Sequence, residues 1–193
     1  MTPAPPIVLC DACVLYPSLI RNLLMHLAVS GLVAARWTDE IQDEWIRNLL
    51  AARPDLSAER LQRTRRFMEQ AVPDAQVTGY EGIVPSLSLP DADDRHVLAA
   101  AIHAGAEFLV TFNLKDFPVA ALHSLDVLTP DGLVCRLLDS SPEATVDAVE
   151  GLRITLRQPA YPPAEFLERL ERVGLPEAAR RLQTHHDLLA DDR

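Results

Sequence analysis

Four acidic residues that lie far apart in the chain have the residue type and spacing of a metal site: Asp11, Glu44, Asp94 and Asp116. Asp11 directly follows an apolar run, and Asp116 comes shortly after a second one. Carboxylates that are brought together repel one another, so a fold tolerates them at one place only if a cation is bound there. The spacing therefore predicts a cation site.

The expected chemistry of such a site is phosphodiester hydrolysis. Mg²⁺ and Mn²⁺ take oxygen ligands, and they use a few carboxylates together with substrate phosphate. A metal held in this way orients water for in-line attack on phosphorus and neutralises the charge that develops. The sequence contains no G-x-S-x-G, no Gly-rich phosphate loop and no H-E-x-x-H, so serine hydrolases, P-loop proteins and zincins find no support.

Strands and helices that alternate along the chain must position the acids. The apolar run at Ile7–Cys10 lacks a period-two pattern, which is typical of a strand buried on both faces of a parallel sheet. A helix is expected over Ser18–Val29, with Gly31 as its stop. Further strands are predicted at Leu32–Trp37, Val77–Tyr80, Glu107–Thr111 and Asp126–Leu128.

Three more helices are expected before residue 130. One is capped by Thr38 and carries Glu44, an Arg-rich one opens at 55–57 and ends at Pro73, and one runs from Asp93 or Asp94 to His103. Alternating strands and helices predict a parallel sheet with helices on both faces.

Topology alone brings three of the acids to one edge. Sites in such sheets form outside the carboxyl ends of the strands, where Asp11, Asn113 and Asp116 are expected. Asp94 opens a helix, where backbone N–H groups favour negative charge. Glu44 lies at the border of an apolar stripe, a position that by itself favours a solvated flank.

Four stretches together resemble the PIN domain. They are 11–15 (DACVL), 38–44 with Glu44 at its end, 91–101 followed by Gly105-Ala106, and 110–117 (VTFNLKDF). The resemblance covers about residues 6 to 130, and the last two stretches carry most of its weight.

The resemblance implies a three-layer α/β/α sandwich with a central parallel sheet, and a ribonuclease that uses Mg²⁺ or Mn²⁺. Many members are toxins of bacterial toxin–antitoxin pairs, so the implied partners are RNA and a cognate antitoxin protein. The domain is expected over residues 1–130, and we also expect a homodimer.

The resemblance further assigns roles to residues. Asp11, Glu44, Asp94 and Asp116 are implied as metal ligands and catalytic acids; Thr111 is implied to orient Asp11 and Asn113 to lie near the substrate phosphate. The chain departs from the family where polar residues usually follow the first Asp, since Ala12 and Cys13 stand there. A hydrogen bond to the substrate, or one that supports a metal ligand, is therefore expected to be missing, which would weaken activity.

Residues 131–193 are expected to form a helical appendage. Its helices are predicted at Pro142–Leu156, Ala164–Val173 and Pro176–Leu189. Such an appendage could cap the sheet, form a dimer contact or bind a partner, and the sequence does not choose among these roles.

The formal net charge of −10 is not that of a protein that binds long nucleic acid mainly by neutralising phosphates. An RNA role must therefore use the metal or a local basic patch. The candidates for such a patch are Arg53, Arg60, Arg63, Arg65 and Arg66, although a solvated helix surface is the commoner explanation for such a cluster.

Two rival functions remain open. Cys10 and Cys13 form a C-x-x-C after a predicted strand, the setting of a thiol-disulfide oxidoreductase, although two buried thiols explain it more simply. A PIN-like scaffold could also bind RNA or protein without cutting. His96 is assigned no catalytic role, and His185 and His186 are expected at the surface.

The expected location is the cytoplasm. The chain starts without a basic segment followed by an apolar one, and no apolar run reaches the length of a membrane span.

Overall fold

The computed structural model describes residues 4–118, 125–157 and 160–184. Its elements are, in chain order, β1 (Ile7–Cys10), α1 (Ala12–Leu15), α2 (Ser18–Val29), β2 (Ala34–Arg36), α3 (Asp39–Ala52), α4 (Ala58–Ala71), η1 (Pro73–Ala75), η2 (Val84–Ser86), α5 (Arg95–His103), β3 (Phe108–Val110), η3 (Leu114–Asp116), β4 (Asp126–Leu128), α6 (Pro130–Ser140), α7 (Pro142–Thr155), α8 (Pro163–Arg172) and α9 (Pro176–Thr184).

The sheet is parallel and has the strand order β2-β1-β3-β4. Leu9 pairs with Arg36 on one side and with Leu109 on the other. The chain therefore moves from β1 to one neighbour, β2, and then crosses to the opposite neighbour, β3. Ligands bind at such a switch point, outside the carboxyl ends of the two strands that flank it.

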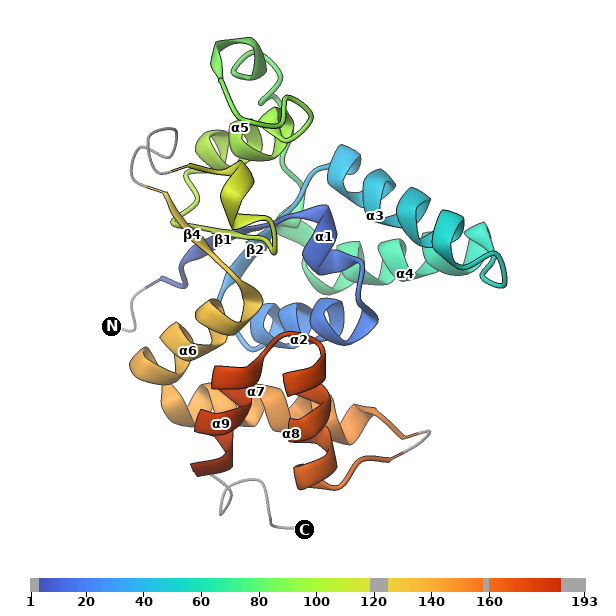
Figure 1. Cartoon of the computed structure of the whole chain (residues 1–193), viewed down its shortest axis with the longest axis vertical. Helices are drawn as coiled ribbons and strands as arrows, with labels where there is room; N and C mark the ends of the chain where they lie inside the picture. The colour runs from blue at the N-terminus through green and yellow to red at the C-terminus, as the bar shows by residue number, and fades with distance from the viewer. Residues whose placement is uncertain (1–3, 119–124, 158–159, 185–193) are drawn as a thin grey trace.

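Helices cover both faces of this sheet, as expected for a three-layer α/β/α sandwich. Helix α5 packs on β1 and β3, whereas α2 packs on β2 and α6 on β4. Figure 1 shows α5 above the sheet and α2 and α6 below it. The strands are short. Their sequences lack alternation because both faces of the sheet are buried, as the full burial of Val8, Leu9 and Leu109 shows. The predicted fold class is confirmed.

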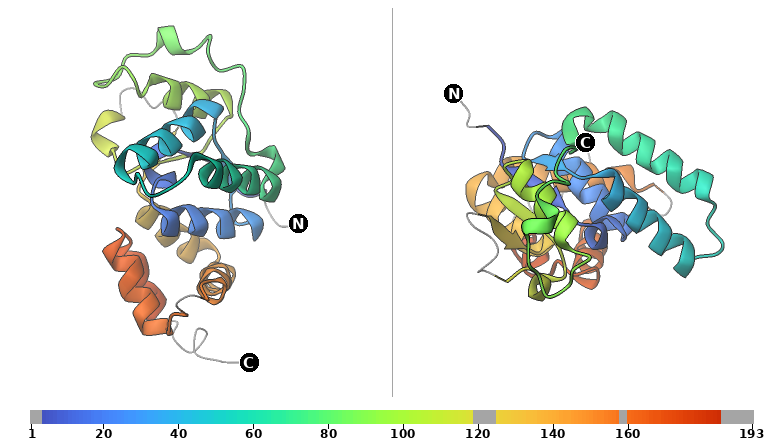
Figure 2. Two further views of the ribbon diagram at one scale, coloured as in Figure 1. Left: turned by 90° about the vertical axis from the view of Figure 1, so that its right-hand side faces the viewer. Right: turned by 90° about the horizontal axis from the view of Figure 1, so that it is seen from above.

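Helices α6 to α9 gather at one end of the molecule. In Figure 1 and in the left view of Figure 2, α8 and α9 lie at the bottom and α5 lies toward the top. Helix α9 packs on α8 and α6, and α7 packs on α2. The tail is thus joined to the sheet domain through α6 and α7.

Two expectations about the elements were wrong. Val77–Tyr80 is not a strand, because Gly79 has φ +83°, and the extended pairing there is one bridge between Gln76 and Trp37. Helix α6 was not expected, although Thr129 caps it and Pro130 occupies its first turn, as is typical of a helix start. The predicted helices of the tail correspond to α7, α8 and α9, with residues 185–189 outside the described range.

No helix within the described residues is long and apolar enough to cross a membrane.

A buried arginine holds α1, α2 and α3 together beside the carboxyl edge of β1. Arg21 donates from Nη1 to the carbonyl oxygens of Leu15 at 2.6 Å and Tyr16 at 3.3 Å. Its guanidinium lies 4.6 Å from the ring centre of Trp45. Burial lowers the pKa of Arg21 to about 10, so the side chain remains charged at neutral pH.

We expect Arg21→Met to lower the free energy of unfolding by about 2–3 kcal/mol, because two carbonyls would lose a charged donor in the core. Urea denaturation monitored by circular dichroism measures this loss. Arg136→Met is the matched control, since Arg136 also lies over an aromatic ring, that of Phe108, but its side chain is 52% exposed. Equal losses in the two variants would contradict a special role for Arg21.

Candidate functional site

Asp11 stands directly at the carboxyl end of β1 and is almost fully buried. It is the N-cap of α1, and its Oδ1 accepts a hydrogen bond from the backbone N–H of Ala12 at 2.6 Å. Its Oδ2 accepts from the Thr111 hydroxyl at 2.7 Å. Thr111 follows β3, so this bond joins the two strands that flank the switch point and fixes the direction of the Asp11 carboxylate.

Cys13 occupies the position beside Asp11 where a missing hydrogen bond was expected. Its thiol donates to Asp11 Oδ2 at 3.1 Å, and its sulfur accepts from the backbone N–H of Phe112 at 3.2 Å. The sulfur also lies 3.3 Å from Thr111 Oγ1. The expectation of a missing hydrogen bond was therefore wrong at Cys13, because the thiol is both a donor and an acceptor, and at Ala12 it stays a prediction.

The same two cysteines tell against redox chemistry. Cys10 and Cys13 are free thiols, and burial, followed by the charge of Asp11, raises the pKa of each to about 12. A reactive thiol needs a lowered pKa, since the thiolate is the nucleophile. These surroundings suit structural thiols.

The other acids line a cleft of about 450 Å³ at the same edge of the sheet. Asp94 precedes α5 and makes no side-chain hydrogen bond to the helix, so its carboxylate is not used as a cap. Glu44 comes from α3, and Asn113 and Asp116 come from the turn after β3. The cleft is lined by Glu40, Glu44, Arg47, Asn48, Asp91, Asp93, Asp94, His96, Asn113 and Asp116.

The electrostatics of Asp94 show how crowded these charges are. Partial burial raises its pKa to about 6, and the charges of Asp11, Asp91, Asp116 and Glu44 act in the same direction. Each of the four acids singled out in the sequence therefore contributes to one negative region. Asp11 is not among the lining residues, but of the charges that raise the pKa of Asp94 it has the largest effect.

The chemistry of this donor set fits a hard divalent cation. The donors are carboxylate oxygens, and a cation would offset the repulsion that raises the pKa of Asp94. In the part of the chain that the structure describes, no three His, Cys, Asp or Glu side chains stand close enough to hold a metal ion together. The carboxylates would have to turn toward one another to do so.

His96, which was assigned no catalytic role from the sequence, also lines the cleft. Its Nε2 lies 3.7 Å from Glu44 Oε2, and its Nδ1 lies 3.6 Å from Glu40 Oε2, which also accepts from the Tyr80 hydroxyl at 3.2 Å. Although burial alone would lower the pKa of His96, the two glutamates raise it. The sequence did contain a signal for a cation at this place: Glu40 and Glu44 are one helical turn apart and so present two carboxylates on one face of α3.

The arginines proposed for RNA contact do not line the cleft. Arg65 is paired with Asp39, Asp43 and Glu69, and Arg53 is paired with Asp55. The others, Arg60, Arg63 and Arg66, are exposed on α4. The arginine that lines the cleft is Arg47 on α3, which had not been singled out.

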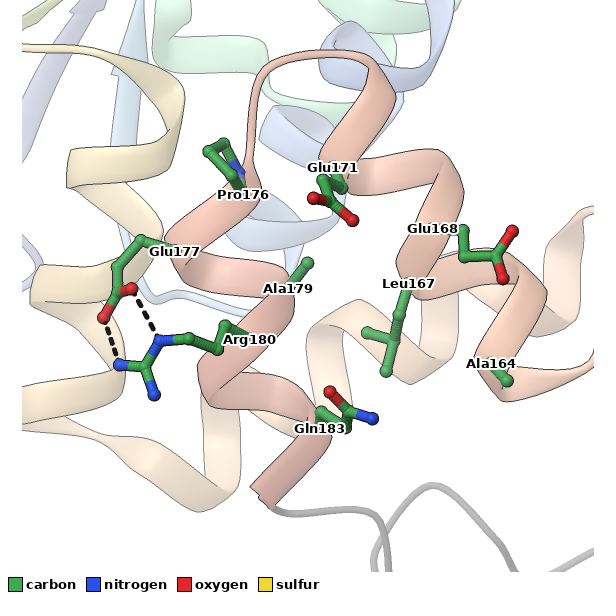
Figure 3. Close-up of a pocket in the computed structure, with 9 residues that line it drawn as sticks. All are labelled: Ala164, Leu167, Glu168, Glu171, Pro176, Glu177, Ala179, Arg180 and Gln183. Atoms are coloured by element: carbon green, nitrogen blue, oxygen red, sulfur yellow. Dashed lines mark hydrogen bonds and ion pairs between the residues drawn. The ribbon is translucent and has the colours of Figure 1, made fainter.

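A second hollow, of about 600 Å³, lies between α8 and α9 (Figure 3). It contains none of the four acids, and its wall is formed by residues of the tail such as Leu167 and Ala179. Glu177 at its edge is already paired with Arg180. This hollow brings no catalytic grouping together.

Comparison with known proteins identifies the family. Residues 130–184 match the family described as VapC50 C-terminal domain, and residues 7–115 match the family described as PIN domain. "Putative ribonuclease VapC50" of Mycobacterium tuberculosis (strain ATCC 25618 / H37Rv) is 36% identical over 94 residues, which are 48% of this chain and 55% of that protein. The match thus spans about half the length of this relative, and no solved structure matches the chain.

The PIN match covers more than half of the chain and contains Asp11, Glu44 and Asp94. It ends one residue before Asp116, which the structure places in the same cleft as Glu44 and Asp94. A parallel sheet with an acidic cleft at its switch point agrees with this match, and the chain belongs to the PIN domain family.

Proposed function

We propose that this chain is a divalent-metal-dependent endoribonuclease that hydrolyses RNA phosphodiester bonds and acts as the toxin of a toxin–antitoxin pair. The observation that carries the proposal is the convergence of Asp11, Glu44, Asp94 and Asp116 from separate elements at the switch point of the sheet. The relative that is named as a ribonuclease supports it.

Asp11, Asp94 and Asp116, with Glu44, would hold Mg²⁺ or Mn²⁺. When bound, such an ion supplies an activated water and offsets the charge that develops on the phosphate. Thr111 fixes the orientation of the Asp11 carboxylate through its 2.7 Å hydrogen bond. His96 holds Glu44 from the side of α5.

Two polar residues at the cleft can bind the substrate backbone. Asn113 can donate from its side-chain amide to a phosphate oxygen, and Arg47 offers a guanidinium that suits phosphate. Arg60, Arg63 and Arg66 on α4 could contact RNA farther from the cut bond, whereas Arg53 and Arg65 are engaged by carboxylates. Backbone contacts of this kind bind RNA without reading its sequence.

The proposed partners are the RNA substrate, a cognate antitoxin protein and a second copy of the chain in a homodimer. The boundary between the nuclease domain and the helical tail is proposed at residue 130, where the second family match begins. The proposed location is the cytoplasm.

The proposal is tested by incubating the purified protein with total RNA, with and without Mn²⁺, and separating the products on a denaturing gel. We expect cleavage that requires Mn²⁺ and stops when EDTA is added. RNA that is bound in a gel-shift assay but never cut would favour a non-catalytic PIN-like module instead.

Cys13 gives a smaller, graded prediction. Cys13→Ala should lower the cleavage rate about tenfold, because Asp11 loses a donor and Phe112 loses an acceptor. Cys13→Ser should keep the rate within about threefold, since a hydroxyl can make both bonds. Initial rates at saturating Mn²⁺ measure both effects, and a serine variant as slow as the alanine variant would contradict this role for the thiol.

A further inference from the structure

Within the described residues, the tail comes close to the active-site edge beside Phe112. A Cβ atom added to Gly174, in the connection between α8 and α9, would lie 3.2 Å from Cε1 and 3.7 Å from Cζ of Phe112. Phe112 stands between Thr111, which binds Asp11, and Asn113, which lines the cleft. The contact therefore links the C-terminal helices to the loop that carries two of the site residues.

The connection around Gly174 is held firmly on both sides. Gly174 has φ +101° and ends α8 in a Schellman motif: its N–H bonds to the Glu171 carbonyl at 3.0 Å, and the N–H of Leu175 bonds to the Leu170 carbonyl at 3.0 Å. The N-terminus of α9 is capped by Asp131 of α6, which accepts from Ala178 at 2.8 Å. Figure 3 shows this connection between Glu171 and Pro176 at one end of the hollow.

Two other helices end in the same motif, and they provide an internal comparison. Gly31 after α2 and Gly105 after α5 have φ +72° and +61° and the same pair of backbone hydrogen bonds. A Cβ at either of these two glycines would meet nothing within 4 Å. At Gly174 the absence of a side chain serves the turn and also leaves room for the Phe112 ring.

The position of Phe112 affects the acids on both sides of it. Its backbone N–H bonds to Cys13, whose thiol bonds to Asp11. On the other side, the N–H of Asp116 bonds to the Asn113 carbonyl at 3.0 Å, so the turn after Phe112 is one compact unit. The ring itself is 37% exposed, and Gly174 lies beside it.

We propose that the C-terminal helices are a positioning element of the active site. Gly174 supports the Phe112 ring and thereby keeps Asn113 and Asp116 in register with Asp11. Gly174 and Phe112 are positioning residues, because they act through the loop rather than on the substrate. This inference rests on the proposed ribonuclease function for its activity readout.

The experiment compares Gly174→Ala with Gly31→Ala in the full chain. Both variants place a Cβ at a positive φ in a Schellman turn, so both should lower Tm, and Gly174→Ala should lower it more because its Cβ also meets the Phe112 ring. Gly174→Ala should also lower kcat about threefold or more with a smaller change in KM, because the Phe112 ring must give way by a few tenths of an ångström beside the loop that carries Asn113. Gly31→Ala should leave kcat unchanged.

A double-variant cycle shows whether the effect passes through the ring. Phe112→Ala should lower kcat on its own, and adding Gly174→Ala should lower it little further, because no ring remains to be displaced. Equal kcat values for Gly174→Ala and wild type, or fully additive losses in the double variant, would overturn the inference.

The two proposals fail in different ways. If the wild-type protein cuts no RNA, the proposed function fails, and the inference is then judged by the rise in Tm on adding Mn²⁺, which Gly174→Ala should reduce and Gly31→Ala should not. If Mn²⁺ does not raise the Tm of the wild type either, the proposed function and the inference both fail.

Discussion

Asp94→Asn is expected to lower Mn²⁺-dependent RNA cleavage about 100-fold or more while leaving the protein folded. The Asp94 carboxylate lines the cleft and makes no side-chain hydrogen bond to α5, and its pKa is raised first by partial burial and then by the surrounding acids, so we expect it to serve a cation rather than the core. A lost ligand removes several kcal/mol of charge stabilisation, and each ~1.4 kcal/mol is a factor of ten in rate.

The measurement is a time course of RNA cleavage by purified wild type and variant at saturating Mn²⁺. Asp147→Asn is the matched control, because it makes the same change of charge at an exposed position of α7. Cleavage by Asp94→Asn at the wild-type rate would remove Asp94 from the site.

The same variant should alter how stability depends on pH in EDTA. The folded-state pKa of Asp94 is raised from 3.8 to about 6, so the folded protein holds the proton more tightly than the unfolded chain does. The stability from this group is fully present below about pH 4 and is lost as pH rises through about 6. Asp94→Asn should lack this pH-dependent contribution. At pH 7 its free energy of unfolding should exceed that of the wild type by about 1 kcal/mol, a figure reduced for solvent screening.

Local sequence signals were sufficient to predict an element or a site residue where a single segment of the chain determines its position. The apolar run before Asp11 predicts β1, and the carboxyl-edge rule places Asp11 and Asp116 at one edge of the sheet. For β1 and Asp11, the signal and the residue that it positions lie within a few positions of each other. The hydrogen bond between Thr111 and Asp11 joins distant segments, and it was implied by the family resemblance rather than by a local signal.

Contacts between distant segments could not be read from the sequence. His96 faces Glu40 and Glu44 only because the fold brings the first turn of α5 to the same cleft as α3, and no pattern within α5 records that arrangement. Val77 and Tyr80 are buried as a strand residue would be, but Gly79 bends the backbone between them. The contact of Gly174 with Phe112 depends on how α8 and α9 dock, which the amphipathic pattern of each helix does not specify.

The role of Cys13 shows a related difficulty. A comparison with the family at position 13 compares only residue types. Because Cys stands there in place of a polar residue, the comparison suggests a lost hydrogen bond. The structure brings three polar atoms within 3.3 Å of the sulfur, so the thiol functions as a polar group there. Whether a cysteine acts as an apolar residue or as a hydrogen-bonding residue is decided by its neighbours, which here are Asp11 and the two residues after β3, Thr111 and Phe112.

Mn²⁺ is expected to raise the Tm of the wild type by roughly 5–10 °C at a hundred times its Kd. Binding to the folded state alone contributes about 2.7 kcal/mol at that concentration, and a chain of this size gains roughly 2–4 °C per kcal/mol. Asp11→Asn should keep half of this rise or less, since a tenfold weaker Kd leaves about 1.4 kcal/mol.

Asp11→Asn isolates metal binding because each variant is compared with its own metal-free Tm. The amide keeps an oxygen that can accept from Ala12 or Thr111, and Asn is a good N-cap, so α1 and the fold should persist. The amide nitrogen cannot bind a cation, and it would face the donors of Cys13 and Thr111, which should lower the metal-free Tm as well. Differential scanning fluorimetry over a series of Mn²⁺ concentrations separates the two effects, with Asp147→Asn expected to shift like the wild type. An unchanged Mn²⁺ shift in Asp11→Asn would remove Asp11 from the proposed ligands.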